Sequence, residues 1–236
     1  MALKYAANDA SAVMGELQQH GQRLFQAIHT KPLLDRDVTL VNIDKAFAEL
    51  AGQVQESDVF VLYLAGHGIV LGGSYHFIPS EAVYRSESAM HEQSLNEQRL
   101  RELLAKIHAQ KSLIILDTCY AGAAGNLASL ATALAARGDL SEKTAITKLQ
   151  RATGRAVLAA SSDKQLALEG CKEHGCFTYA LLEGLKGQAD RGHKGEVSVL
   201  ELAEYVTEEV PRLTGDRQFP IFEAQDLKPF PIGLTP

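Results

Sequence analysis

Hydrophobic positions recur with the helical period of 3.6 residues in several separate stretches of the chain. In residues 9–20, Val13 and Leu17 fall on one face of a helix, and Thr39 stands where an N-cap is expected for a second helix that continues up to Gly52. Further helices are predicted at residues 95–109, 127–136, 143–152, 177–187 and 199–210. Ser94 is the expected N-cap of the first of these helices, and Ser198 that of the last.

Other stretches are apolar without helical period and are rich in β-branched and aromatic residues. Such continuous runs are typical of strands that are covered on both faces of a parallel sheet. Strands are therefore predicted at residues 23–29, 58–65, 112–117 and 155–161. Because strands and helices alternate along the chain, the sequence predicts parallel β-α-β units and an open α/β sheet with helices on both faces.

Composition narrows the class of protein further. A chain of 236 residues with 46% hydrophobic residues can bury the core of a single large domain. The formal net charge of −6, without clustered Lys and Arg, argues against nucleic acid as a partner. The N-terminus lacks the pattern of a signal peptide, no run of 18 apolar residues occurs, and three cysteines do not form a disulfide framework. We expect a soluble, cytoplasmic protein that does not contact a membrane.

Two reactive side chains follow two of the predicted strands. His67 lies in "LAGHG" after residues 58–65, and Cys119 lies in "LDTCYAG" after residues 112–117. Regular structure is expected to stop at both places, and the carboxyl ends of parallel strands share one edge of a sheet, where ligands bind. A thiol becomes a strong nucleophile when an imidazole accepts its proton. The alternative is a small core cysteine and a structural histidine in a glycine turn.

Four stretches of the chain together resemble a known family: "LKYAANDASAVMGEL", "VFVLYLAGHG", "SLIILDTCYAG" and "GCFTYALLEGLKGQAD". They are similar to the caspase-like clan of cysteine peptidases, and most closely to the bacterial relatives of metacaspases, the orthocaspases. The resemblance implies a three-layer sandwich with a mostly parallel central sheet and no required cofactor. It also implies a Cys119–His67 dyad that forms a thioester acyl-enzyme, with the N–H groups of Gly68 and Cys119 as oxyanion donors.

The resemblance also implies a preference among peptide substrates. Asp117, Asp9 and, by a looser alignment, Glu169 match positions that line the pocket for a basic P1 residue, which favours cleavage after Arg or Lys. Read alone, Asp9 is an N-cap and Asp117 a turn residue. Ala65 departs from the family, which usually has Ser there, and this removes one polar contact to P1. The alternative function is a catalytically inactive interaction or regulatory module of the same fold.

The resemblance sets expectations for domain organisation. Residues 1–236 are read as one peptidase domain with a larger part at 1–120, a linker or processing segment at 121–154 and a smaller part at 155–236. The family's first strand is missing, so we expect a domain excised from a longer protein, with a fused or bound sensor domain. Self-cleavage is expected near basic residues such as Lys148 and Arg155. The segment "CKEHGC" lacks a second ligand pair, so no metal site is predicted.

Overall fold

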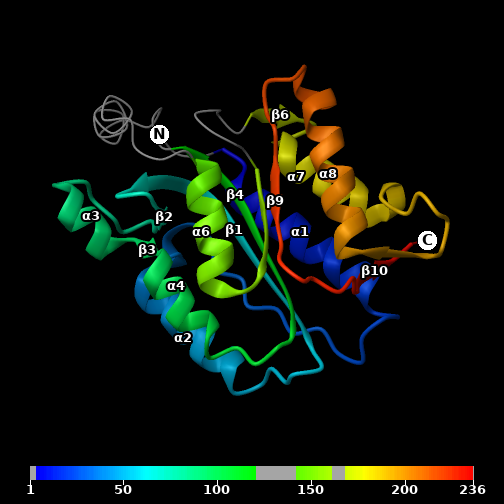
Figure 1. Cartoon of the computed structure of the whole chain (residues 1–236), viewed down its shortest axis with the longest axis horizontal. Coiled ribbons are helices and arrows are strands. Elements are labelled where there is room, and N and C mark those ends of the chain that lie inside the picture. Colours follow the sequence, from blue (N-terminus) through cyan, green and yellow to red (C-terminus); the bar gives the residue numbers. More distant parts are fainter. Residues whose placement is uncertain (1–3, 121–141, 161–167, 236) are drawn as a thin grey trace.

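The computed structural model describes residues 4–120, 142–160 and 168–235 of the chain. Its centre is a six-stranded sheet in the order β3-β2-β1-β4-β5-β9 (Figure 1). The three strands in the middle, β1, β4 and β5, run parallel, and the outer strands are antiparallel to their neighbours. The strands of this sheet are β1 (Val59–Leu71), β2 (Ser74–Ile78), β3 (Leu95–Asn96), β4 (Lys111–Tyr120), β5 (Ala156–Ala159) and β9 (Ile221–Glu223).

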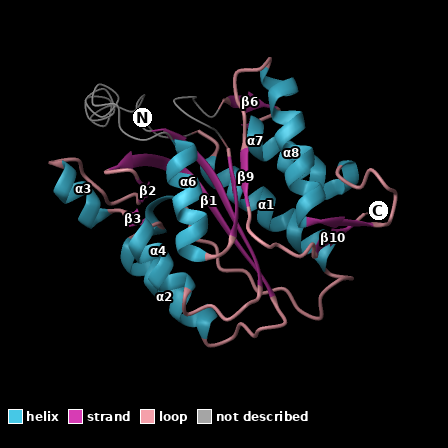
Figure 2. Ribbon diagram, viewed as in Figure 1, coloured by secondary structure: helices cyan, strands magenta, loops and turns pink. Residues whose placement is uncertain are grey.

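Helices cover both faces of the sheet, as Figure 2 shows. One face carries α1 (Ala6–Gly21), α7 (Cys176–Glu183), the π-helical turn η3 (Gly184–Gln188) and α8 (Val199–Thr214). The other face carries α2 (Leu40–Ala51), α4 (Glu97–Leu104) and α6 (Glu142–Thr153). Smaller elements are η1 (Asp35–Asp37), α3 (Glu87–Gln93) and two ribbons, β6 (Glu169–Cys171) with β7 (His174–Gly175) and β8 (Glu196–Ser198) with β10 (Pro231–Leu234).

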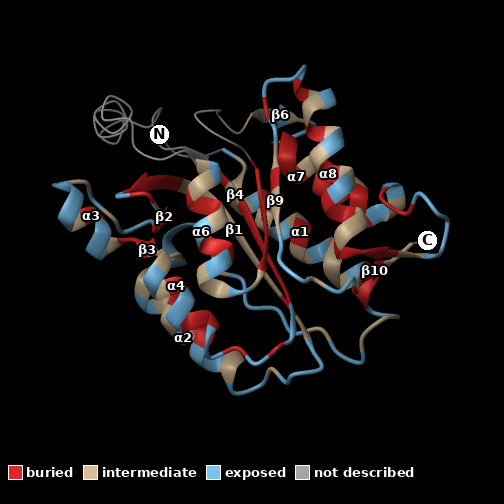
Figure 3. Ribbon diagram, in the orientation of Figure 1, coloured by how far each residue is buried: buried red, intermediate tan, exposed pale blue. Residues whose placement is uncertain are grey.

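The side chains of β4 alternate between two hydrophobic cores. Leu113 and Ile115 belong to the core beneath α1, α7 and α8, whereas Ile114 and Leu116 belong to the core beneath α2, α4 and α6. All four are at most 1% exposed. Burial concentrates along β4, β5 and the inward faces of the helices, whereas β1 is mostly half-buried up to His67 (Figure 3). Burial of β4 and β5 is as expected for parallel strands covered on both faces. The fold predicted from the sequence, an α/β sandwich of the caspase-like kind, is confirmed.

Two of the three predicted N-caps are confirmed. The Thr39 hydroxyl accepts a hydrogen bond from the Asn42 N–H at 3.2 Å, and Ser198 forms a full capping box with Glu201. Ser94 is wrong as the cap of α4, which begins two residues later than predicted. Residues 95 and 96 pair with β2 first, and the Asn96 side chain then accepts from the Arg99 N–H at 2.9 Å.

The strand predicted at residues 23–29 is wrong. This segment is irregular, and its apolar side chains Phe25 and Ile28 fold back against Gly21 at the end of α1. A strand needs a neighbour to satisfy its backbone groups. Within the described part of the chain, residues 59–66 of β1 pair with β4 only, since β2 begins to pair at His67. Among the described residues, 59–66 therefore form a free edge of β1, and the absence of the family's first strand stays a prediction.

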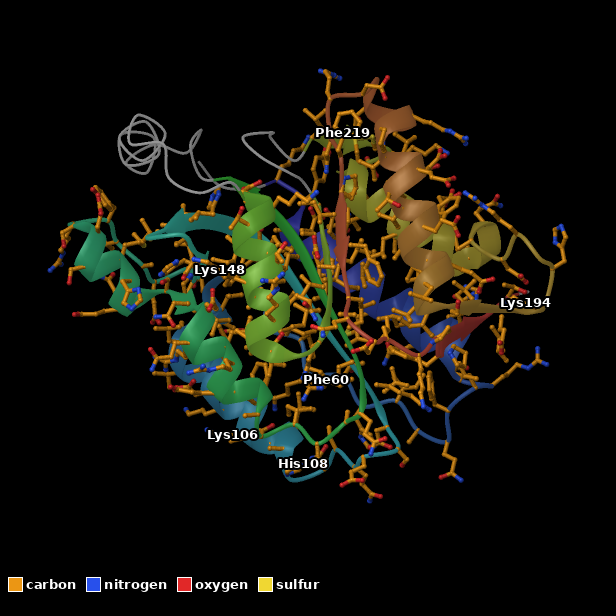
Figure 4. The ribbon with its side chains drawn as sticks, viewed as in Figure 1. Phe60, Lys106, His108, Lys148, Lys194 and Phe219 are labelled. Atoms are coloured by element: carbon orange, nitrogen blue, oxygen red, sulfur yellow. A yellow bond between two sulfur atoms is a disulfide. The ribbon has the colours of Figure 1, made fainter. Side chains whose placement is uncertain are left out.

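Basic residues at the predicted processing segment take part in the packing. Lys148 on α6 donates to the Gly73 carbonyl at 3.0 Å (Figure 4). Arg155 donates to three carbonyls around the end of α4, those of Leu104, Ile107 and Ala109. Lys148 is thus bonded to the turn between β1 and β2, and Arg155 to the end of α4 and the segment after it. Residues 121–141, with the helix predicted at 127–136, lie outside the described residues. None of the described helices is long and apolar enough to cross a membrane.

Candidate active site

The backbones of His67 and Cys119 lie side by side in the sheet. β1 and β4 are parallel, and their register pairs His67 with Cys119 and Gly68 with Tyr120. Neighbouring strands are about 4.8 Å apart, so two residues far apart in sequence share one place in the fold. The side chain of Cys119 lies outside the described part of the structure, whereas that of His67 is half-buried.

The predictions that regular structure stops at "GHG" and before Cys119 are both wrong, since β1 continues past His67 and β4 runs to Tyr120. β1 continues to Leu71. The chain then turns at Gly72 and Gly73, which have positive φ values of 54° and 75°, and enters the antiparallel strand β2. His67 is the first residue of β1 that pairs on both sides, with Ile78 of β2 and with Cys119 of β4. The backbone of His67 therefore pairs with a strand on each side, which fixes its position as a catalytic group requires.

The glycines beside His67 allow close packing. A β-carbon at Gly66 would stand 2.7 Å from the Phe77 ring, and one at Gly68 would stand 3.0 Å from the Thr118 hydroxyl oxygen. Thr118 in turn accepts a hydrogen bond from the buried Tyr75 phenol at 3.2 Å. Burial raises the pKa of Tyr75, so this phenol stays neutral and remains a donor. The motif "GHG" is therefore also a packing requirement.

Asp117, two residues before Cys119, is held by two hydroxyl groups. Its Oδ2 atom accepts from the Thr178 hydroxyl of α7 at 2.5 Å and from the Tyr63 phenol of β1 at 3.2 Å. Burial, followed by the negative charge of Asp117, raises the pKa of Tyr63 well above its ordinary value. Tyr63 is therefore a neutral donor to the carboxylate. Both hydroxyls fix the direction in which this acidic group points.

Asp9 is buried in the first turn of α1 and reaches across to the β6–β7 hairpin. Its Oδ1 atom lies 2.6 Å from His174 Nδ1, and its Oδ2 atom accepts from the Gly175 N–H at 3.0 Å. Tyr5, not Asp9, is the N-cap of α1. A carboxylate in a first helical turn also interacts favourably with the helix dipole. Asp9 thus connects α1 to a hairpin that is distant in the sequence.

The carboxylates of Asp9 and Asp117 converge on Gly175. A β-carbon at this position would stand 3.3 Å from Asp9 Oδ2 and 3.4 Å from Asp117 Oδ2. A side chain at position 175 would therefore crowd Asp9 and lie in contact with Asp117. The register of the hairpin pairs Glu169 with Gly175, although the Glu169 side chain lies outside the described part of the structure. The structure thus brings two of the three predicted acidic side chains together.

Several residues of this region were not identified from the sequence. Tyr63 and Thr178 are polar positions inside apolar runs, and only the tertiary structure shows that both reach Asp117. His174 and Gly175 lie in "CKEHGC", where nothing in the sequence signals contact with Asp9. Among the described residues, no three His, Cys, Asp or Glu side chains gather as metal ligands would.

The segment "CKEHGC" contains a disulfide between Cys171 and Cys176. The sequence did not predict this bond, because three cysteines in a chain of this size form no framework. A disulfide between cysteines five positions apart needs no such framework, since it closes a single short hairpin. Cys119 is consequently the one cysteine of the chain outside the disulfide.

Comparison with known families agrees with this geometry. The model of the caspase domain family matches residues 1–231, almost the whole chain. The chain therefore belongs to the caspase domain family, a family of cysteine peptidases. This confirms the resemblance to the caspase-like clan, whereas the closeness to orthocaspases stays a prediction. A search of curated proteins returned no match.

Proposed function

We propose that this protein is a cysteine endopeptidase that cleaves peptide bonds after Arg or Lys by means of a Cys119–His67 dyad. The observation that supports the dyad most directly is the register of β1 and β4, which pairs the backbones of these two residues. Membership of the caspase domain family supports the reaction class. The convergence of Asp9 and Asp117 at Gly175 supports the preference for a basic side chain.

The proposed reaction proceeds in two halves. His67 takes the proton of the Cys119 thiol, and the thiolate attacks the peptide carbonyl carbon. The N–H groups of Gly68 and Cys119 stabilise the oxyanion of the tetrahedral intermediate. The C–N bond breaks as His67 protonates the leaving amine, which leaves a thioester on Cys119. Water, deprotonated by His67, then attacks the thioester and releases the carboxylic acid and the free thiol.

Charge supports the proposed preference for Arg or Lys at P1. The carboxylates of Asp9 and Asp117 both lie next to Gly175, and the backbone of Glu169 pairs with Gly175 in the hairpin. A guanidinium or ammonium group placed there would form charge-assisted hydrogen bonds. An acidic P1 side chain would meet like charges and would be disfavoured.

The test uses fluorogenic peptides that differ only in an Arg, Lys or Asp residue before the cleaved bond. The purified protein should release the fluorophore from the Arg and Lys peptides and not from the Asp peptide. Cys119→Ala and His67→Ala variants, checked for folding by thermal unfolding, should lose activity. Equal signals from the wild type and Cys119→Ala would show that the activity belongs to a contaminant. Preferential cleavage after Asp would overturn the proposed specificity.

The free edge of β1 favours a second candidate function, a non-catalytic interaction module. Residues 59–66 present backbone groups to a partner strand, as edge strands do. A fused or bound regulatory domain could supply that strand. The two functions differ in the reactivity of one thiol. A peptidyl electrophile should label the wild type and spare Cys119→Ala if the protein is a peptidase, whereas a non-catalytic module should react no faster than a free thiol.

A further inference from the structure

The β6–β7 hairpin forms one wall around the two converging carboxylates. Gly175 belongs to β7, and its N–H donates to Asp9 Oδ2. His174, the residue before it, contacts Asp9 Oδ1 through Nδ1. The hairpin therefore contacts both oxygens of one carboxylate. Asp9 is only 3% exposed, so water has little access to it.

The turn of this hairpin has an unfavourable backbone conformation. Lys172 and Glu173 have φ values of 49° and 70°, the left-handed region that two-residue hairpin turns of type I′ require at both central positions. Asn and Gly are the residues usually found there, because other side chains are disfavoured with positive φ. This turn has neither. Other contacts must therefore hold its geometry.

Two contacts of the hairpin supply that support. The Cys171–Cys176 disulfide joins the end of β6 to the start of α7, directly across the turn. On the other side, the Asn8 amide of α1 donates to the Glu173 carbonyl at 3.2 Å. His174 lies between these two restraints. Its approach to Asp9 thus depends on a turn that the disulfide closes.

The base of the hairpin is anchored independently of the disulfide. The Leu168 carbonyl accepts from the Cys176 N–H at 2.8 Å, and the Leu168 N–H donates to the buried side chain of Gln218 at 2.9 Å. The amide nitrogen of Gln218 donates in turn to the Ala160 carbonyl at the end of β5. Loss of the disulfide should therefore relax the turn and leave the sheet and α7 in place.

We propose that His174 is a specificity-determining positioning residue, which holds Asp9 in the substrate pocket, and that the Cys171–Cys176 disulfide braces it there. This inference rests on the proposed function and deepens it. Two carboxylates that converge on one point repel each other, so Asp9 needs donors to hold its direction beside Asp117. His174 and Gly175 supply two such donors. Without the brace, Asp9 turns away and basic side chains bind more weakly.

The variants follow from the contact geometry. His174→Ala removes the hydrogen bond to Asp9, whereas His174→Asn places an amide nitrogen near the position of Nδ1 and should retain it. Cys171→Ser/Cys176→Ser removes the brace and leaves Cys119 as the one cysteine. His108→Ala is the matched control, because His108 is an exposed histidine beside the start of β4, at the end of that strand opposite to Cys119 (Figure 4).

The experiment measures kcat and KM for a peptide with Arg at P1, together with the rate at which iodoacetamide alkylates Cys119. His174→Ala and the double serine variant should raise KM about tenfold, the size expected for a lost hydrogen bond to a charged group, with kcat within about twofold. His174→Asn and His108→Ala should match the wild type. Iodoacetamide does not use the pocket, so its rate should stay the same in every variant.

The outcomes separate this inference from the proposed function. If the wild type shows no preference for Arg over Asp peptides, the proposed function fails and the inference fails with it. If the preference is present but His174→Ala and the double serine variant keep the wild-type KM, only the inference is overturned. A His174→Asn variant as impaired as His174→Ala would also overturn it. Thermal unfolding of each variant shows whether a change in KM merely reflects loss of the fold.

Discussion

The hydroxyl oxygens of Tyr63 and Thr178 lie 2.7 Å apart, and both groups also hydrogen-bond to the same oxygen of Asp117. The three residues come from β1, α7 and β4, so this small network joins a helix to two central strands. Thr178 is fully buried. The direction of the Asp117 carboxylate therefore depends on packing between the sheet and α7.

Replacing Thr178 by Val should impair both stability and substrate binding. Valine keeps the shape of threonine but leaves a partly buried carboxylate without one of its donors, which costs about 1–3 kcal/mol of unfolding free energy. Urea unfolding measures this loss, and KM for an Arg peptide should rise in the same variant. Ser11→Ala on the exposed side of α1 is a control for removing a hydroxyl. Wild-type stability and KM in Thr178→Val would contradict the role given to this network.

Adding one methyl group beside His67 should destabilise the fold. In Gly66→Ala the new carbon would lie 2.7 Å from the Phe77 ring, and such overpacking costs about 1–3 kcal/mol. Gly15→Ala is the matched comparison, since nothing lies within 4 Å of a β-carbon there and the position is inside α1. That change should stabilise the protein by about 0.5–1 kcal/mol. Equal effects in the two variants would show that close packing is not the reason for glycine at position 66.

Stability should fall in mild acid because of His76. This buried histidine donates from Nδ1 to the Ser74 carbonyl and accepts at Nε2 from His91 Nδ1, each at 2.9 Å, which requires the neutral ring. Burial lowers the pKa of His76 to about 4. Its ordinary value is about 6.5, so between these two pH values the unfolded chain binds a proton that the folded chain does not.

The contribution of neutral His76 to stability is therefore complete above about pH 6.5 and is lost as the pH falls toward 4. The total is on the order of 3 kcal/mol. Urea unfolding of the wild type and His76→Asn at several pH values isolates this contribution as the difference between the two curves. Parallel curves across this range would contradict the assignment.

The disulfide should be detectable by counting thiols. Iodoacetamide applied to the denatured protein without a reductant should add one alkyl group, on Cys119, and after reduction it should add three. Intact-protein mass spectrometry gives the count directly, and Cys119→Ala should give none and then two. Three groups without a reductant would show that Cys171 and Cys176 are thiols in the isolated protein. Free thiols at both positions would agree with the expected cytoplasmic setting, where cysteines are kept reduced.

The sequence predicted the three parallel strands of the sheet, but not the three antiparallel ones, and part of the site. The runs at 58–65, 112–117 and 155–161 each have a continuous apolar centre, which is typical of strands in a parallel sheet, and all three form strands. The segment at 23–29 has a similar pattern but no neighbouring strand to pair with. Ser94 was a good cap by residue type, yet pairing of Leu95 with β2 delayed the helix. Pattern alone does not reveal such partners.

The site shows the same limit. His67 and Cys119 were identified because reactive residues next to strands indicate chemistry, and Asp9 and Asp117 only because the resemblance to the caspase-like clan implied them. His174 was not, since its contact with Asp9 joins residues 165 positions apart. That contact exists because a hairpin with an unfavourable turn packs against α1, and the sequence "CKEHGC" shows neither the turn nor the disulfide that closes it.

The side chain of Gln218 connects two parts of the fold that are separate in the sequence. Its two amide atoms bind Ala160 and Leu168, which are the residues on either side of 161–167. The ends of this connection are therefore fixed by one buried side chain, whatever sequence joins them. A change at Gln218 should therefore disturb the end of β5 and the base of the β6–β7 hairpin together, although Gln218 lies in neither element.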